Sequence, residues 1–366
     1  MEPDMRAVSS LYGGFWNFDI QDFCYMTNRY FPPQEFLDSL SASLPRLLGS
    51  YPSTNQHLSS LTAEPLGLSQ NELVVGNGAS ELISAITSLR VKHLAIPIPT
   101  FDEYRNRAQT QGKQVTSYPM GLDFTLDVDG FIAHAHESGA NAVVLVQPNN
   151  PAGTLVARDD VVRMLRAFDD LDMVLIDESF LYFAGEDYRK LSVADLIHEF
   201  PNLVIVNSMS KAYGVPGLRL GYAISGDKRF IARLRAEVPI WSINSLAQFF
   251  LENMGEYESQ FTESCAQVSA ATQTFYLGLQ SVPWMEPYPT YGNYILCRTS
   301  PGLTGTGVTE RLFDEFGVLV NDCSGKGGLD SRFFRIASRT TAENEELLRT
   351  LLSMASETRT PEIARK

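Results

Sequence analysis

One lysine, Lys211, lies in the stretch SMSKAYGVPGLRLGY (208–222), between two serines and a turn rich in glycine and proline. Partial desolvation in such a loop would lower the pKa of its ammonium group and make the amine nucleophilic. A lone lysine is more often a solvated surface residue. Its neighbours reverse that weighting, since Ser208 and Ser210 offer hydroxyls and Arg219 offers a planar fork suited to a dianionic phosphate. Together these groups indicate a carbonyl cofactor that carries a phosphate.

Other candidate residues follow other apolar runs. Asp177 in DESF is either a turn aspartate or a buried carboxylate that keeps a ring nitrogen protonated. Asn150 in QPNNPAG follows a strand in a turn, and a type I turn explains the proline and glycine but not two successive amides. GNGASELI (76–83) predicts a helix that begins near Ala79, whose free amides suit a phosphate. Phe101 in PTFDEY either stacks on a flat ring or fills the core.

Short β-branched runs must position these residues, and they alternate with helical stretches such as 159–171. Strand, helix and strand at this spacing predict βαβ units with right-handed crossovers and a parallel sheet. Ligands of such sheets bind beyond the carboxyl ends of the strands, so we expect QPNNPAG, DESF and SMSK to meet there. The apolar runs, typical of strands buried on both faces, are 93–99, 141–148, 172–179 and 203–210.

The sequence pattern changes after Val238 to long stretches with helical periodicity, followed by short strand-like runs. This change predicts a second, smaller α+β domain in an α/β protein. The predicted organisation is an N-terminal segment joining the small domain (1–45), a large domain (46–245) and a small C-terminal domain (246–366).

Composition excludes several classes of function. The chain has 366 residues, and its 43 acidic and 29 basic residues give a formal charge of -14, which disfavours nucleic acid and membrane partners. Its four cysteines and five histidines lack metal-ligand or disulfide spacing, so no metal site is expected. The start MEPDMRAVSS lacks the profile of a secretory signal. These features predict a cytoplasmic location.

The ordered set GNGAS, PTF, QPNNPAG, DESF, SMSKAYGVPGLRLGY and FRIASR resembles fold-type I enzymes of the class I/II aminotransferase group, which depend on pyridoxal 5'-phosphate (PLP). The resemblance covers about residues 28 to 350, and within the group it is strongest to L-threonine O-3-phosphate decarboxylase and histidinol-phosphate aminotransferase-like enzymes. It implies a large PLP-binding domain with a mostly parallel mixed sheet flanked by helices, a small α+β domain, and a homodimer with a shared active site.

The resemblance also implies a role for each matching residue. Lys211 would be the Schiff-base lysine that forms the internal aldimine, and Asp177 the partner of the pyridinium nitrogen. Asn150 would bond the ring 3-hydroxyl, and Phe101 would stack on the ring face. Arg335 in FFRIASR would clamp the substrate α-carboxylate, since a bidentate guanidinium is the natural partner of a planar carboxylate. The implied phosphate contacts are Ala79, Ser80, Ser208 and Arg219, with Tyr51 reaching across from the other subunit.

The chain departs from the family pattern at the substrate end. Phe180 stands where the aminotransferases usually have a tyrosine, as in the phosphothreonine decarboxylases. Those decarboxylases bind the substrate phosphate with a histidine and an arginine, whereas the matching positions here hold Tyr12 and Asn321. Each lost cation removes a charge-assisted hydrogen bond of about 1.5–3 kcal/mol, and Asp322 would add negative charge. We therefore expect a pocket for a neutral or cationic side chain, with Asn28 as a polar contact, although Tyr12 is alternatively a packed aromatic residue.

Three reactions at the Cα of an amino acid remain open. The first expectation is an aminotransferase that acts on an unphosphorylated amino acid through Lys211. The alternatives are a PLP-dependent amino-acid decarboxylase, or a lyase or cyclase that acts on a cationic, arginine-like amino acid. A PLP-binding regulator without activity is disfavoured, because Lys211, Asp177, Arg219 and Arg335 are all present.

Overall fold

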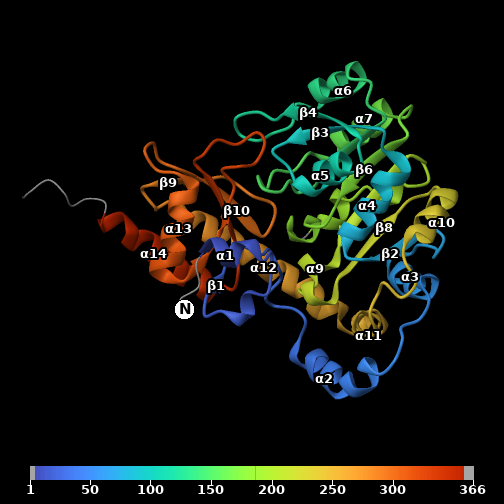
Figure 1. Cartoon of the computed structure of the whole chain (residues 1–366), viewed down its shortest axis with the longest axis horizontal. Coiled ribbons are helices and arrows are strands. Elements are labelled where there is room, and N and C mark those ends of the chain that lie inside the picture. The colour runs from blue at the N-terminus through green and yellow to red at the C-terminus, as the bar shows by residue number, and fades with distance from the viewer. Residues whose placement is uncertain (1–4, 186, 358–366) are drawn as a thin grey trace, which may run out of the picture.

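The computed structural model describes residues 5–185 and 187–357. Its larger part is built on a seven-stranded sheet with helices on both faces (Figure 1). The strand order is β2-β8-β7-β6-β5-β3-β4, and β8 runs antiparallel to both of its neighbours while the pairs among β3 to β7 are parallel. This confirms the predicted α/β fold with a mostly parallel mixed sheet. The strands are β2 (Leu73–Asn77), β3 (His93–Ile98), β4 (Gln114–Pro119), β5 (Ala142–Val146), β6 (Met173–Asp177), β7 (Leu203–Ser208) and β8 (Leu220–Ile224).

The strands are shorter than the apolar runs that predicted them. The run 203–210 ends as a strand at Ser208, because Met209 begins the short helix α9 (Met209–Ala212). The run 141–148 ends as a strand at Val146, just before a segment whose two prolines lack the N–H that a ladder requires.

Both faces of the sheet are buried under helices. Along β5, Val143 and Leu145 pack with helices α3, α6 and α7, whereas Val144 and Val146 pack with α4, α5 and α10. This alternation follows from the two-residue period of a strand and explains why the run is apolar throughout. These helices are α3 (Asn55–Ala63), α4 (Ala79–Arg90), α5 (Asp102–Thr110), α6 (Val128–Glu137), α7 (Arg158–Ala167) and α10 (Lys228–Glu237).

The smaller part is a four-stranded antiparallel sheet in the order β12-β13-β10-β9, packed with helices α13 and α14 and the second half of α12. Tyr276, Phe275 and Leu279 of α12 contact this core. Its elements are α12 (Glu258–Leu279), β9 (Met285–Pro287), β10 (Tyr294–Thr299), α13 (Gly305–Phe316), β12 (Asn321–Asp322), β13 (Phe333–Ala337) and α14 (Thr341–Glu357).

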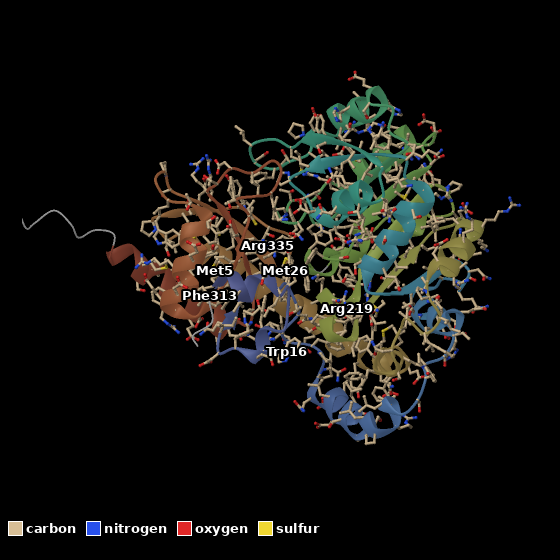
Figure 2. The ribbon with its side chains drawn as sticks, in the orientation of Figure 1. Met5, Trp16, Met26, Arg219, Phe313 and Arg335 are labelled. Atoms are coloured by element: carbon tan, nitrogen blue, oxygen red, sulfur yellow. The ribbon has the colours of Figure 1, made fainter. Side chains whose placement is uncertain are left out.

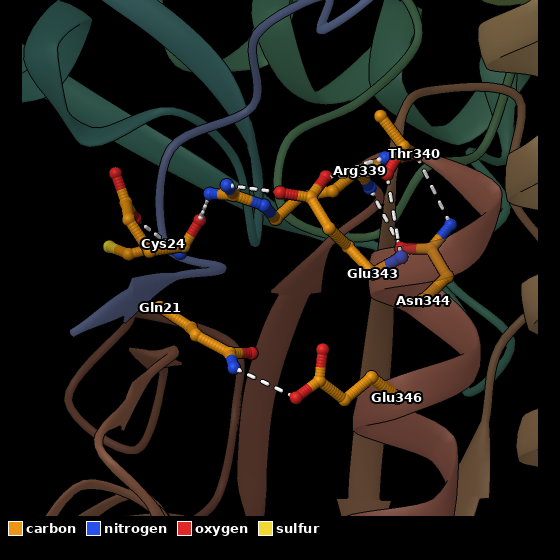
Figure 3. Close-up of polar contacts among 8 residues, drawn as sticks. Gln21, Cys24, Arg339, Thr340, Glu343, Asn344 and Glu346 are labelled. Carbon is orange, nitrogen blue, oxygen red and sulfur yellow. Dashed lines mark hydrogen bonds and ion pairs between the residues drawn. The ribbon is translucent and has the colours of Figure 1, made fainter.

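The N-terminal segment lies against the smaller part. Strand β1 (Gln21–Asp22) pairs in parallel with β11 (Val318–Leu319), and Met5 of α1 (Met5–Ser10) packs beside Phe313 of α13 (Figure 2). Gln21 donates a hydrogen bond from Nε2 to Glu346 of α14 at 3.3 Å (Figure 3). Segments from the two ends of the chain thus form one structural unit.

The predicted division into 1–45, 46–245 and 246–366 remains a prediction. The side-chain core of the larger part extends beyond residue 245, since Phe250 of α11 (Ser245–Asn253) and Phe261 and Val268 of α12 belong to it. Phe36 of α2 (Gln34–Leu48) packs on Phe250 with ring centroids 5.5 Å apart. The remaining short helices are α8 (Tyr188–Leu191), η1 (Phe15–Asn17), η2 (Glu64–Leu66), η3 (Leu181–Phe183), η4 (Ala194–Leu196), η5 (Pro216–Leu218) and η6 (Met254–Tyr257).

Candidate active site

Asp177 is the last residue of β6 and is 4% exposed. Its Oδ2 accepts a hydrogen bond from the Tyr104 hydroxyl at 2.7 Å, and its Oδ1 accepts from the Ser179 amide at 2.9 Å. Burial raises the pKa of this carboxyl, while the bonds from Ser179 and Tyr104 and the charge of Lys211 oppose the rise. The carboxylate is therefore held in one orientation in a dry site, where a cationic partner would be strongly bound.

Lys211 lies on α9, directly after the end of β7. Burial, together with the nearby positive charges of Arg335 and Arg219, lowers the pKa of its amine to about 8, against the opposing charge of Asp177. Its Nζ lies 5.8 Å from the centroid of the Phe180 ring. An amine with this pKa is partly neutral near pH 7–8, as a nucleophile or general base requires.

The start of α4 forms a cradle for a dianion. No side chain caps this helix, so its first backbone N–H groups point outward at Ala79 and Ser80. Gly78 donates from its amide to the Arg219 carbonyl at 2.7 Å, and a Cβ on Gly78 would lie 2.4 Å from the Arg219 guanidinium. Only glycine allows that approach, and Arg219 itself has a left-handed backbone with φ of 56°. The loop therefore fits a phosphate between the helix amides and Arg219.

Four further residues near the strand ends fit the expected PLP. The Ser210 hydroxyl is buried and has no hydrogen-bond partner among the described residues. Asn150 is 5% exposed, and its Oδ1 accepts from Arg335, so its amide N–H groups are directed elsewhere in the site. Phe101 precedes α5 and is 37% exposed, which leaves ring surface for stacking. Ser208 is the last residue of β7, and its amide donates to Ser179 Oγ at 2.9 Å.

Arg335 enters the site from β13 of the smaller part, opposite Arg219 of the larger part (Figure 2). It is 5% exposed and donates from Nη1 to Asn150 Oδ1 at 2.6 Å and from Nη2 to the Cys24 carbonyl at 3.0 Å. Its Nε is buried and has no acceptor within the described part of the chain. A buried guanidinium with an unused donor, and with no carboxylate partner among the residues described, is suited to an anionic ligand group.

The residues expected to contact the substrate side chain do not all point into one pocket. Asn28 is 2% exposed, and its Nδ2 donates to the Ala212 carbonyl and to Ser264 Oγ while its Oδ1 accepts from the Tyr30 amide. Both Nδ2 hydrogens of its amide thus anchor the N-terminal segment behind α9, and a contact between Asn28 and the substrate stays a prediction. Tyr12 is 88% exposed with φ of 51°, so it is not the packed aromatic residue of the alternative interpretation.

Asn321 faces two thiols. Its Nδ2 donates to Cys323 Sγ at 3.2 Å, and its Oδ1 accepts from the Cys24 thiol at 3.8 Å. Asp322 does not share this pocket: it is exposed and accepts from the Ser324 amide and the Thr306 hydroxyl. Successive side chains of a strand point to opposite faces, which is why the expected negative charge lies on the other side.

Tyr51, expected to reach the phosphate of a second subunit, is 79% exposed. Its ring stacks on Trp241 with centroids 4.4 Å apart. Its role across a dimer stays a prediction.

Sequence reasoning missed Tyr104, Ser179 and Tyr294. Tyr104 could have been predicted from the sequence, because it lies one helical turn after Phe101 in PTFDEY and so faces the same site. Tyr294 donates to the Asn149 carbonyl at 2.7 Å, and its ring centroid lies 5.6 Å from the Arg335 guanidinium carbon. No local motif signals this residue, since only the pairing of β10 with β13 brings it to the site.

Residues 5–185 and 187–357 contain no cluster of histidine, cysteine and carboxylate side chains arranged to hold a metal ion. None of the helices within these ranges combines the length and the apolar character that crossing a membrane requires.

The sequence and the fold are similar to those of known proteins. The family model for class I and II aminotransferases matches residues 15–351. CMP-5'-(3-aminopropyl)phosphonate synthase of Streptomyces rubellomurinus is 34% identical over 343 residues, which is 93% of this chain but only 54% of that protein. L-serine phosphate decarboxylase of Campylobacter jejuni is 29% identical over 350 residues, covering 92% of this chain and 89% of that protein. The solved histidinol-phosphate aminotransferase of Clostridium acetobutylicum superposes with a TM-score of 0.85 at 26% identity, over 92% of this chain and all of that one.

Proposed function

The chain belongs to the class I and II aminotransferase family of PLP-dependent enzymes, and from this premise we propose that it decarboxylates a small α-amino acid. The sequence alone favoured transamination. The chain is similar over nine-tenths of its length to proteins named as decarboxylases, and this similarity supports placing decarboxylation ahead of transamination.

Phe180 is the observation that carries the proposal. Its buried ring lies edge-on to Tyr294, with centroids 4.9 Å apart, and 5.8 Å from the amine of Lys211. A carboxylate placed against this apolar wall loses its hydration, whereas the carbon dioxide that leaves is neutral and apolar. The wall therefore favours loss of the carboxylate over its retention.

The residues of the chain divide the work. When bound, PLP supplies an electron-withdrawing ring that stabilises negative charge at Cα. Asp177 would hold a proton on the ring nitrogen, and the α4 amides with Arg219 would hold the phosphate. Arg335 would bind the incoming carboxylate, and the Lys211 amine would deliver a proton to Cα after carbon dioxide has left.

The substrate side chain is proposed to be unphosphorylated. Tyr12 lies in solvent, and the Asn321 amide is engaged by Cys24 and Cys323, so neither position supplies a cation. Lys326, the nearest lysine along the chain, is paired with Asp102. These contacts support a substrate that differs from the phosphorylated amino acid in the names of the relatives.

Transamination is the second candidate. Arg335 is anchored to Asn150 at 2.6 Å, so a carboxylate that stayed on Arg335, away from the Phe180 ring, would be kept in place. That arrangement favours breaking the Cα–H bond, with Lys211 moving the proton and the amino group retained on the enzyme.

The protein is proposed to act as a homodimer in the cytoplasm. The stacked pair of Tyr51 and Trp241 and the exposed Ile240 (77%) and Leu48 (75%) form apolar surface suited to a partner subunit. The four cysteines are free, as in a reducing compartment.

The test is to supply the PLP-loaded enzyme with carboxyl-labelled amino acids and to measure released carbon dioxide and 2-oxo acid in parallel. Decarboxylation predicts labelled carbon dioxide and an equal amount of primary amine, without 2-oxo acid. Formation of 2-oxo acid in amounts equal to enzyme, without carbon dioxide, would replace the proposal with the second candidate.

A further inference from the structure

A cavity of about 730 Å³ lies on the face of the sheet that packs with α3 and α12. Its walls come from β7 and β8, from η2 and η3, from α8, from residues 192–198, and from the start of α12. Cavities of this size hold small organic ligands. The proposed decarboxylation uses none of the side chains that line this cavity.

One buried acceptor among the residues that line this cavity lacks a donor. Asn207 is 4% exposed and donates from Nδ2 to the Glu178 carbonyl at 3.2 Å. Its Oδ1 is buried and accepts no hydrogen bond from the described residues. A buried acceptor without a donor costs about 1–3 kcal/mol, so a ligand that supplies an N–H or O–H would stabilise this side chain.

The Glu178 carboxylate lies in the same wall. It is 6% exposed, and its oxygens accept from the Val193 amide at 3.0 Å and the Ser192 hydroxyl at 2.7 Å. Both partners are neutral donors, so its charge is not cancelled by a direct ion pair among the described residues.

Aromatic rings form much of the remaining wall. Tyr213 stacks on Phe261 with centroids 4.0 Å apart, and Tyr182 meets Phe261 edge-on at 5.4 Å. The Tyr182 and Tyr222 hydroxyls are 3.2 Å apart, and Tyr188 lies 5.1 Å from Tyr182, ring to ring. Faces of tyrosine and phenylalanine rings attract cations, most strongly where water is excluded.

The cations along this wall are compensated or lie at its edge. Arg189 pairs with Glu258 at 2.9 Å. The side chain of His198 is 64% exposed, and Asp195 is already engaged by Arg158. The interior thus presents one carboxylate, one unused acceptor and several rings, a combination that selects positive charge.

We propose that this cavity is a second ligand site, specific for a small organic cation of the alkyl- or arylammonium class. The ammonium N–H donates to Asn207 Oδ1, its charge lies near Glu178, and its apolar part packs on the tyrosine and phenylalanine rings.

The site is separate from the catalytic lysine. Met209 of α9 and Tyr213, which directly follows this helix, line the cavity, and Lys211 lies between them in sequence. Residues four apart share a helix face, and the residue midway between them points to the other side. Helix α9 therefore separates the occupant from the amine of Lys211.

The test is calorimetric titration of the PLP-loaded enzyme at pH 8 with N,N-dimethylbenzylammonium, and with benzyl alcohol as the neutral control. A tertiary ammonium has one N–H and cannot condense with the cofactor aldehyde. Burial raises the pKa of the Glu178 carboxyl to about 7, so the carboxylate is ionised at pH 8. We expect the cation to bind at least tenfold more tightly than the alcohol, without competition from an amino acid at the active site.

Two variants keep the inference falsifiable. Ala194→Phe places a ring in the cavity and should abolish binding, whereas the matched Ala194→Ser should preserve it. Glu178→Gln should weaken binding of the cation tenfold and leave the alcohol unchanged, with the visible absorbance of bound PLP as the check of folding. Equal affinities for cation and alcohol, undiminished binding in Ala194→Phe, displacement by an amino acid or no binding at millimolar cation would each overturn it.

Discussion

The two ends of the candidate active site are held in different ways. At the cofactor end, Asp177 ends β6 and Lys211 follows the adjacent parallel strand β7. Asp177 is buried and hydrogen-bonded, and Lys211 is half-buried with a lowered pKa. At the substrate end, Arg335 is fixed by the Cys24 carbonyl, 311 residues earlier in the chain, while Tyr12 lies in solvent. The sheet builds the first end, whereas the second depends on how the N-terminal segment packs against β12 and β13. We therefore expect substitutions in the N-terminal segment to change which substrate is bound and to leave cofactor binding unchanged.

The strongest challenge to this comparison is Asp177→Asn. Loss of the charge that stabilises the protonated ring nitrogen should lower kcat about 10²–10³-fold, the size found when one preorganised electrostatic group is removed. Steady-state kinetics on PLP-loaded protein measures it. Tyr104→Phe is the matched control: it removes one hydrogen bond to the same carboxylate and should cost about tenfold or less. Equal losses in the two variants would contradict the role of the charge.

At the substrate end, Arg335→Lys should raise KM about 10–100-fold with a smaller change in kcat. A lysine replaces a planar two-pronged donor with a point charge and loses about 1.5–3 kcal/mol of charge-assisted bonding. Arg332→Lys is the control, because Arg332 pairs with Asp330 near the surface. An unchanged KM in Arg335→Lys would remove this residue from the substrate site.

The apo protein offers a test of the buried amine without catalysis. The pKa of Lys211 is about 8 in the folded chain and near 10.5 when solvated, so the folded state binds fewer protons between these values. Stability is therefore lost as pH falls from 10.5 to 8 and stays reduced below pH 8. Apo Lys211→Met should be more stable than apo wild type by about 1–3 kcal/mol at pH 7, with the difference shrinking above pH 8. Urea denaturation at several pH values measures it, and a difference independent of pH would refute the buried charge.

The smallest effect is expected for Tyr12→Phe. Because the Tyr12 side chain is 88% exposed, the equilibrium constant for unfolding and kcat/KM should each change by less than about twofold. A loss of tenfold or more in kcat/KM would mean that the N-terminal segment closes over the substrate.

The sequence predicted the cofactor end because each of its residues is next to a strand end in a local motif. Asp177 and Asn150 could be placed from apolar runs and turn chemistry alone. The partners of Asn28 could not, because Ser264 and Ala212 approach it only in the folded chain. The same holds for Asn321, whose thiol neighbours include Cys24, 297 residues away in sequence. Long-range packing decides these contacts, and no local pattern records it.

The most direct test of the central claim is borohydride reduction of the PLP-loaded protein, followed by digestion and peptide mass spectrometry. The account predicts one pyridoxyl group, attached to Lys211, and none in Lys211→Ala. A protein that takes up no PLP, or a pyridoxyl group on a different lysine, would contradict it.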